Sequence, residues 1–163
     1  MLMRFISTIF ILFFMAACGS TPDTVDSSDT GSISETSGSS SSSLVGGSQE
    51  DLVINVGDRV FFGFDSYDLN SDAQQRLQDQ AAWLKQYSDV SITVEGHCDE
   101  RGTREYNIAL GERRAQAMKN YLIGLGVSAG RISTISYGKE RPAVVGSNDG
   151  AWSQNRRSVT TVN

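Results

Sequence analysis

A run of charged residues between two regular patterns constrains the fold of this chain more than any other feature. Before the run, apolar and polar residues alternate over 90–94, which indicates a half-buried strand. After it, residues 107–122 carry apolar side chains at the spacing of one helix face. A strand that leads through a charged turn into an amphipathic helix is typical of a domain in which helices pack on a sheet.

The predicted helix carries an arginine in the middle of its apolar face. Arg114 follows Leu110 by four residues and precedes Met118 by four. Thr103 suits the N-cap of this helix, and Gly124 indicates its end. A cation at a core-facing position needs an anion from the protein or from a ligand, unless its aliphatic stem lies along the core and its head reaches water.

The other C-terminal residues continue the alternation of strand and helix patterns. Ser71 and Gln74 resemble a capping box at the start of a second amphipathic helix. The order β-α-β-α-β-β predicts an α/β (α+β) two-layer sandwich, in which the helices pack on one mixed sheet. The elements expected besides those above are a strand at 60–64, a helix at 71–87 and strands at 132–137 and 158–162.

Acidic residues follow the first two predicted strands. Asp65 follows the strand at 60–64, and Asp99 follows the strand at 90–94. Right-handed crossovers would bring these strand ends to one edge of the sheet, where ligand sites of α/β folds are found. Asn107 and Arg114 are seven residues apart and share a helix face. Asp99 and Arg114 together suit a zwitterionic ligand, or they pair with each other and tie the turn to the helix.

The charged turn also invites an enzymatic interpretation, which the sequence supports poorly. His97 is the only histidine, so no spaced histidine pair exists for zinc, and Cys98 lacks an orienting His–Asp arrangement. A muramidase-like pair of Asp65 and Asp99 would need a carboxyl group with a raised pKa, which nothing in the sequence indicates. We therefore expect no enzyme, metal or cofactor. We expect His97 to hydrogen-bond within the turn and Cys98 to be a small filler residue.

The N-terminus predicts export and a lipid anchor. A basic residue precedes an apolar run over 5–14, which is shorter than the about 20 residues of a membrane span and has the length of a secretory signal peptide. Met15-Ala16-Ala17-Cys18 resembles a bacterial lipobox, and Ser20 resembles the outer-membrane sorting pattern. We expect a signal peptide at residues 1–17 and lipid on Cys18. An ordinary signal peptide with a chance cysteine is the alternative.

Residues 18–50 are expected to form a disordered tether to one domain at residues 51–163. The stretch 19–50 is rich in Ser, Thr, Asp and Gly and holds no Lys or Arg. Such a chain has an r.m.s. span of about 30 Å and a stretched length of roughly 110 Å. The whole chain has 14 basic and 19 acidic residues; Arg4 and five tether acids leave 13 and 14 in the domain. This balance, with no basic run between aromatics, argues against nucleic acid.

The charged turn and its surroundings resemble a known family. Gly96-His97-Cys98-Asp99-Glu100-Arg101-Gly102 is followed by Asn107, Leu110, Arg114 and Ala115 at the spacing of the OmpA-like peptidoglycan-binding domain. The segments 61–65, 136–142 and 155–157 resemble it too, so the resemblance covers residues 55–163. The lipobox and tether resemble those of the family's outer-membrane lipoproteins. Cys98 replaces a small residue or threonine, and Arg104 replaces a proline.

The resemblance implies non-covalent binding of the peptide stem of peptidoglycan through its meso-diaminopimelate. It implies that Asp99 takes an ammonium group of that residue and that Arg114 takes a carboxylate. The other implied pocket residues are Phe64, Asp65, Glu100, Arg101, Thr103, Asn107 and Leu110. It also implies a lipid-anchored periplasmic domain that holds the outer membrane to the wall, notably at division, and that exchanges with the propeller protein of the Tol system. A pure protein-docking module with a vestigial pocket is the alternative function.

Overall fold

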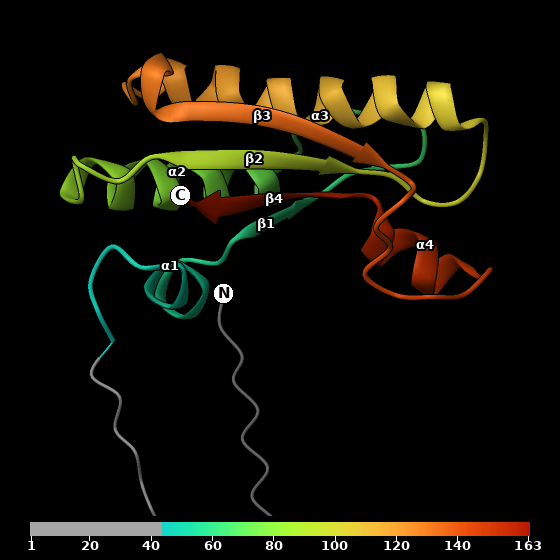
Figure 1. Cartoon of the computed structure of the whole chain (residues 1–163), viewed down its shortest axis with the longest axis horizontal. Coiled ribbons are helices and arrows are strands. Elements are labelled where there is room, and N and C mark those ends of the chain that lie inside the picture. The colour runs from blue at the N-terminus through green and yellow to red at the C-terminus, as the bar shows by residue number, and fades with distance from the viewer. Residues whose placement is uncertain (1–43) are drawn as a thin grey trace, which may run out of the picture. The chain divides into compact units, whose positions relative to one another are not determined.

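The structure is a computed structural model that describes residues 44–163 (Figure 1). The predicted signal peptide, the predicted lipidation at Cys18 and most of the predicted tether lie outside the described residues. The elements are α1 (Gln49–Asn55), β1 (Arg59–Phe61), α2 (Ser71–Gln86), β2 (Ile92–His97), α3 (Arg104–Gly124), a short 3₁₀ turn (Ala129–Arg131), β3 (Ile132–Gly138), α4 (Asp149–Asn155) and β4 (Arg157–Val162).

The four strands form one mixed sheet in the order β1-β4-β2-β3. Strands β2 and β3 are parallel, and β4 runs antiparallel to both β1 and β2. Strands β1 and β2 therefore point the same way, and their C-terminal ends lie at one edge, as the sequence predicted. Figure 1 shows this edge at the right, where α3 begins and α4 lies.

Helices α2 and α3 supply the layer that covers one face of the sheet, which confirms the predicted two-layer α/β fold. Leu77 of α2 and Met118 of α3 are fully buried, as are Ile92 and Val94 of β2. Each such side chain stabilises the fold by about 1.5–3 kcal/mol relative to exposure. The predicted inner stripe of α2 is confirmed by the burial of Ala73, Leu77, Ala81 and Leu84.

The two long helices begin at side-chain caps. Thr103 is the N-cap of α3, as predicted, and its hydroxyl accepts a hydrogen bond from the Tyr106 amide at 3.2 Å. In α2 the predicted Ser71 capping box is wrong, because Asn70 is the N-cap and accepts from the Ala73 amide at 2.8 Å. Asparagine and serine are both favoured at the N-cap, so the sequence alone does not decide which of two adjacent residues caps the helix.

Two helices of seven residues were not predicted. Leu52 of α1 is fully buried, and Asp51 accepts a hydrogen bond from the Trp83 indole of α2 at 2.9 Å. The predicted domain boundary at residue 51 therefore falls inside a packed helix. Helix α4 begins after the cap Asn148. Two turns of helix are too short to show a clear period, which is why the sequence pattern missed them. None of the described helices is long and apolar enough to cross a membrane.

Strand β2 and helix α3 touch backbone to backbone at two glycines. A Cβ atom on Gly96 would lie 1.9 Å from the carbonyl oxygen of Gly111. A Cβ atom on Gly111 would lie 2.3 Å from the hydroxyl oxygen of Ser136 in β3. This close approach sets the position of α3 over the sheet directly beside the charged turn.

Candidate ligand-binding site

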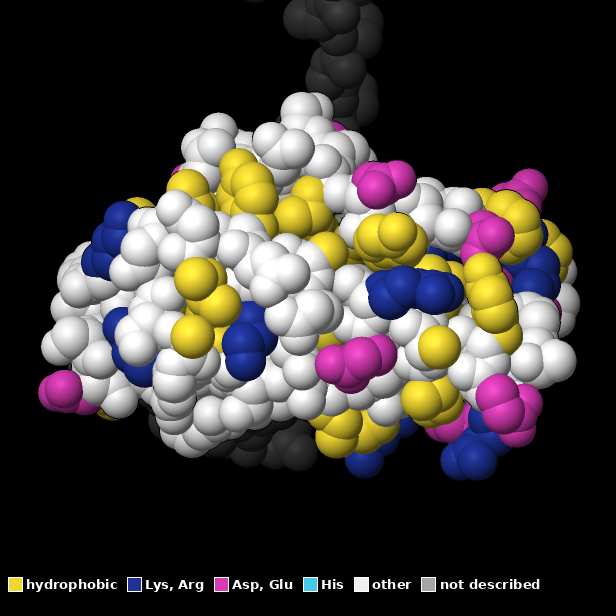
Figure 2. Space-filling view, turned by 90° about the horizontal axis from the view of Figure 1, so that it is seen from above, with side chains coloured by type: hydrophobic (Ala, Val, Ile, Leu, Met, Phe, Trp, Pro, Cys, Tyr) yellow, Lys and Arg dark blue, Asp and Glu magenta, His cyan; other side chains and the backbone are white. Residues whose placement is uncertain are grey.

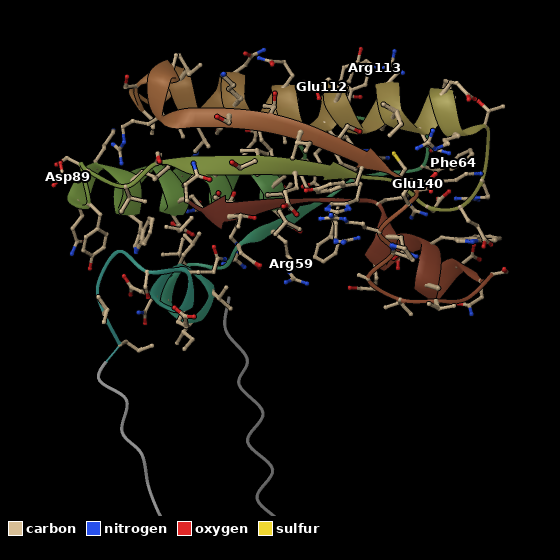
Figure 3. The ribbon with its side chains drawn as sticks, in the orientation of Figure 1. Arg59, Phe64, Asp89, Glu112, Arg113 and Glu140 are labelled. Atoms are coloured by element: carbon tan, nitrogen blue, oxygen red, sulfur yellow. The ribbon has the colours of Figure 1, made fainter. Side chains whose placement is uncertain are left out.

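A cavity of about 470 Å³, measured with its open mouth, lies at the edge where β1 and β2 end. Its walls come from the turns after these strands, the first turns of α3 and the residue before β4. Figure 3 labels Phe64 at this end of the molecule and Asp89 at the opposite end. The lining residues are Phe64, Asp65, Cys98, Asp99, Arg101, Gly102, Tyr106, Asn107, Leu110, Arg114 and Arg156.

Arg114 is the most deeply buried of the three arginines that line this cavity, with no exposed surface. Its Nε donates to the carbonyl oxygen of Ser66 at 2.8 Å, its Nη1 to that of His97 at 2.8 Å and its Nη2 to that of Gly63 at 3.1 Å. Burial lowers the pKa of this guanidinium below its ordinary value. The guanidinium therefore does not reach water, and it ties the turn after β1 to β2 and α3.

The turn after β1 is bent at a residue with an unusual backbone conformation. Asp65 has φ +52°, in the left-handed region that aspartate tolerates better than most residues. Its carboxylate accepts a hydrogen bond from the hydroxyl group of Tyr106 in α3. Strand β1 ends at Phe61, earlier than predicted, and Phe64 lies beyond it with 65% of its surface exposed. Asp65 and Asp99 line the same cavity, as the strand-end argument predicted.

Asp99 is 5% exposed and is bound by two arginines, neither of which is Arg114. Its Oδ2 accepts from Nη2 of Arg101 at 2.6 Å and from Nη1 of Arg156 at 3.3 Å. Its Oδ1 accepts from the amide and the Nε of Arg101, both at 3.2 Å. Burial alone would raise the pKa of Asp99, but the hydrogen bonds from Arg101 and Arg156 outweigh it and lower the pKa. The ion pair between Asp99 and Arg114 that the sequence suggested as one alternative is not formed in the described part of the chain.

The guanidinium of Arg101 lies between two aromatic rings. Its Cζ is 4.1 Å from the ring centroid of Phe64 and 4.1 Å from that of Trp152 in α4. The Trp152 indole in turn donates to Glu100 Oε1 at 3.0 Å. Trp152 and Arg156 received no role from the sequence. Arg156 belongs to the segment 155–157 that resembles the family, and this resemblance was the only feature of the sequence that pointed to a role for Arg156.

Three other predicted site residues hold the charged turn in shape. Asn107 is 2% exposed and donates to the carbonyl oxygens of Arg101 at 2.8 Å and Thr103 at 3.0 Å. Thr103 caps α3, and the carboxylate of Glu100 accepts a hydrogen bond from the Trp152 indole. Neither Thr103 nor Glu100 is among the residues that line the cavity. Leu110 does line it, and supplies an apolar wall.

His97 and Cys98 are structural in different ways. His97 is 2% exposed, and its Nε2 lies 3.5 Å from Oε2 of Glu95. Neither ring nitrogen has a partner with hydrogen-bond geometry among the described residues, so the predicted ring hydrogen bond is not formed. Burial, and then the charge of Arg157, lower its pKa to about 4. Cys98 is 2% exposed, and its thiol donates to the carbonyl oxygen of Asn107 at 3.3 Å. Burial raises the pKa of this thiol, which suits the predicted filler role.

The described part of the chain has no cluster of three or more histidine, cysteine or acidic side chains that could hold a metal ion. What the cavity offers instead is separated charge. Asp65 and Asp99 supply two carboxylates, and Arg101, Arg114 and Arg156 supply three guanidinium groups. Figure 2 shows acidic, basic and hydrophobic side chains interleaved towards the same end of the molecule. Such a site suits a small ligand that carries both signs of charge.

Comparison with known proteins identifies relatives of the whole described domain. Residues 61–156 match the OmpA family. The chain is 59% identical over 116 residues to the peptidoglycan-associated lipoprotein of Agrobacterium fabrum, covering 71% of this chain and 66% of that protein. It is 57% identical over 117 residues to the protein of the same name from Brucella melitensis, covering 72% and 70%. The alignments thus span about two thirds of these relatives.

A solved structure shares the fold. The crystal structure of the peptidoglycan-associated lipoprotein from Burkholderia pseudomallei matches with a TM-score of 0.64 and 40% sequence identity, and covers 65% of this chain and 90% of that chain. The C-terminal domain of Helicobacter pylori MotB matches with a TM-score of 0.61 at 23% identity, covering 65% of this chain and 84% of that domain. The second match bears on the fold alone.

Proposed function

Because this chain belongs to the OmpA family, we propose that it binds peptidoglycan without covalent attachment and without cleaving it. Relatives with more than half of their aligned residues identical are named for association with peptidoglycan. The single observation that carries the proposal is the nearly buried Asp99, bound by two arginines in a cavity that also holds a third guanidinium group.

The proposed ligand is the diaminopimelate of the peptide stem, the amino acid that has an ammonium and a carboxylate at the end of its side chain. Its ammonium would bind Asp99, with Asp65 as the second anion of the cavity. Its carboxylate would bind the guanidinium groups of the cavity, to whose positive charge the buried Arg114 contributes. Charge-assisted hydrogen bonds of this kind are about twice as strong as neutral ones and depend strongly on direction. The lining of two carboxylates and three guanidinium groups suits an amino acid side chain that carries both charges.

The state of Asp99 favours binding over hydrolysis. A glycosidase needs a carboxylic acid whose pKa is raised, so that it can protonate the leaving group near neutral pH. The arginines around Asp99 lower its pKa instead. Asp99 therefore stays an anion over the physiological range, which suits retention of a cation.

The cellular setting is proposed from the sequence and from the names of the relatives. Lipid on Cys18 would place the protein at the outer membrane with the domain in the periplasm, where the tether predicted at residues 18–50 would let it reach the wall. The periplasmic propeller protein of the Tol system is the proposed protein partner, with a role in envelope integrity and in outer-membrane constriction at division. The relatives carry the word lipoprotein in their names, which supports the anchor.

Pull-down with purified sacculi tests the function. The protein should sediment with intact diaminopimelate-type wall and release no soluble muropeptides. Asp99→Asn keeps the shape of the side chain but removes its charge, and should reduce binding by about tenfold or more. Asp89→Asn is the matched control, because Asp89 is exposed at the far end of the domain (Figure 3) and should not affect binding. Undiminished binding by the Asp99→Asn variant would rule out this site.

A further inference from the structure

We infer that the free edge of β1 pairs with β1 of a second copy of this chain. The two strands run antiparallel about a two-fold axis at Val60, and the two sheets join into one. Arg59 of each copy then lies opposite Phe61 of the other copy. This surface shares no residue with the ligand cavity, and the pairing does not depend on the proposed ligand.

The first step is that β1 has backbone groups that face away from the sheet. It is an edge strand, with β4 on one side only (Figure 1). The amide of Thr160 in β4 donates to the carbonyl oxygen of Asp58 at 2.7 Å. Because backbone groups alternate in direction along an antiparallel strand, Arg59 and Phe61 turn theirs away from β4. Such an edge is a template for a further strand.

The second step is that this free edge is as short as β1 itself. Gly57 and Gly63 are the next residues on either side whose backbone groups would face outward, and both are engaged within the domain. The amide of Gly57 donates to the carbonyl oxygen of Leu52 at 2.7 Å, and its own carbonyl oxygen accepts from the side chain of Gln80 at 2.7 Å. The carbonyl oxygen of Gly63 accepts from Arg114 at 3.1 Å. A long foreign strand would find few further partners here, whereas a second β1 matches the edge in length.

The third step is that the edge is complementary to itself. With the two-fold axis at Val60, Arg59 faces Phe61 of the other copy, and Phe61 faces Arg59 of the other copy. Each facing pair exchanges two N–H···O bonds, so every outward group of Arg59 and Phe61 in both strands gains a partner. A register shifted by two residues leaves one facing pair and half of these groups unpaired.

The side chains on the exposed face agree with this register. The side chain of Arg59 is 47% exposed, and Phe61 is 40% exposed (Figure 3 labels Arg59). The register sets each guanidinium group beside an exposed ring of the other copy, which is a favourable cation–π arrangement. Each Arg59 is also neutralised within its own copy, because its Nε and Nη2 donate to Asp58, both at 2.9 Å. The two arginines therefore do not oppose the pairing.

The face towards the helices has space beside β1. Val60 is 2% exposed and lies on the side of α2. An open cavity next to it is bordered by β1 and by Asn70, Asp72, Ala73 and Arg76, at the cap and first turns of α2. The Val60 side chain of the other copy would enter this cavity from the paired strand, so apolar burial adds to the backbone pairing.

The pairing is weak, because three residues from each copy cover far less than the about 1,200 Å² of total surface of a stable interface. Dilute chains should therefore stay monomeric. Two chains held at one membrane by the proposed lipid anchor have a high effective concentration, at which a weak contact suffices. Antiparallel pairing turns the two ligand cavities to opposite ends, because each cavity lies where its own β1 ends. Under the proposed function, one pair would hold two separate wall peptides.

Cysteine cross-linking tests the pairing and its register. Full-length lipidated chains with Arg59→Cys and with Phe61→Cys are reconstituted into phosphatidylcholine vesicles, singly and as a mixture, and oxidised mildly. Facing residues have Cα atoms about 5.5 Å apart, within disulfide range, whereas two copies of one variant place their cysteines about 7–8 Å apart. The mixture should therefore give about tenfold more disulfide dimer on a non-reducing gel than either variant alone.

Two controls accompany this experiment. The wild-type chain measures any product of the buried Cys98. A mixture of Ile135→Cys with Phe61→Cys measures random collision, because Ile135 is 39% exposed on β3, the opposite edge of the sheet. Equal yields from the Arg59→Cys and Phe61→Cys mixture and from the single variants would overturn the inference. Cross-linking of these cysteines to a different protein in cells would assign the edge to a partner's strand and overturn it as well.

Sedimentation equilibrium of the full-length chain, at increasing ratios of protein to detergent, separates the backbone from the side chain. Arg59→Pro removes an outward N–H and leaves the ladder to β4 intact. It should weaken self-association about tenfold or more, because each copy loses a hydrogen bond across the interface. Arg59→Ala removes the same side chain but keeps the N–H, and should weaken it about threefold or less. Equal effects of the two variants, both folded by circular dichroism, would contradict strand pairing.

The same variants separate this inference from the proposed function. Arg59 does not line the ligand cavity, so Arg59→Pro should sediment with sacculi as the wild-type chain does when both are dilute. A wild-type chain that binds sacculi but gives neither cross-linked dimer nor self-association overturns the pairing alone. A chain that pairs but does not bind sacculi overturns the proposed function alone.

Discussion

Asp99 and Arg114 line the same cavity without pairing with each other. Asp99 binds Arg101 and Arg156, and Arg114 binds the backbone carbonyl oxygens of three separate residues. The anion and the cation therefore have different structural surroundings. We propose that Asp99 binds the ligand, whereas Arg114 holds together the turns that form the walls.

Replacement of Arg114 should accordingly destabilise the fold. Arg114→Met keeps the stem and removes the donors to Gly63, Ser66 and His97. The free energy of unfolding should fall by about 3 kcal/mol, because the buried carbonyl group of His97 and the partly buried hydrogen bonds to Ser66 and Gly63 lose their donor. Urea denaturation measures the loss. Arg113→Met, one residue earlier on the exposed face of α3, should change stability by less than about 0.5 kcal/mol. Equal effects in the two variants would contradict the structural role of Arg114.

The glycine contact between β2 and α3 should tolerate no side chain. Gly96→Ala places a methyl group 1.9 Å from the Gly111 carbonyl oxygen, so either the helix or the strand must shift. We expect a loss of about 3 kcal/mol or more in thermal or urea unfolding. Gly124→Ala is the control, because nothing lies within 4 Å of its added methyl group at the end of α3. This variant should be neutral or more stable by about 0.5 kcal/mol.

Stability should depend on pH through His97, the only histidine of the chain. The folded state keeps the ring neutral down to a pKa of about 4, whereas the unfolded chain takes up a proton below the ordinary value of 6.5. The unfolded state therefore binds more protons between these values, and stability falls as the pH is lowered through this window. From pH 7 to pH 5 the loss should be about 2 kcal/mol. Urea unfolding at both pH values tests this, and His97→Gln should remove most of the difference.

Helix α1 should behave as part of the domain and not as tether. Leu52 has no exposed surface, and Leu52→Ala should reduce the free energy of unfolding by about 3 kcal/mol. Ile54 lies two residues later in the same helix and is 64% exposed, so Ile54→Ala should cost less than about 0.5 kcal/mol. If Leu52→Ala has no effect in urea denaturation, α1 does not contribute to the core.

Much of the central architecture could be predicted, because it depends on periodic burial. The stripes of α2 and α3 and the alternation in β2 are local patterns, and each reports which side of an element faces the core. The direction of the strands placed Asp65 and Asp99 at one edge. Helices α1 and α4 escaped prediction because seven residues are too few for a period to stand out.

The sequence by itself determined that α3 carries an arginine on its core-facing side beside an acidic turn, since spacing along a helix decides which side chains share a face. Only the tertiary structure decided the partners of these charges. Arg156 reaches Asp99 from 57 residues away, and Trp152 comes from α4 to stack on Arg101. Arg114 is satisfied by carbonyl groups, which every residue carries and which therefore leave no mark in a sequence. Pairing depends on distance in space, and a linear pattern records only distance along the chain.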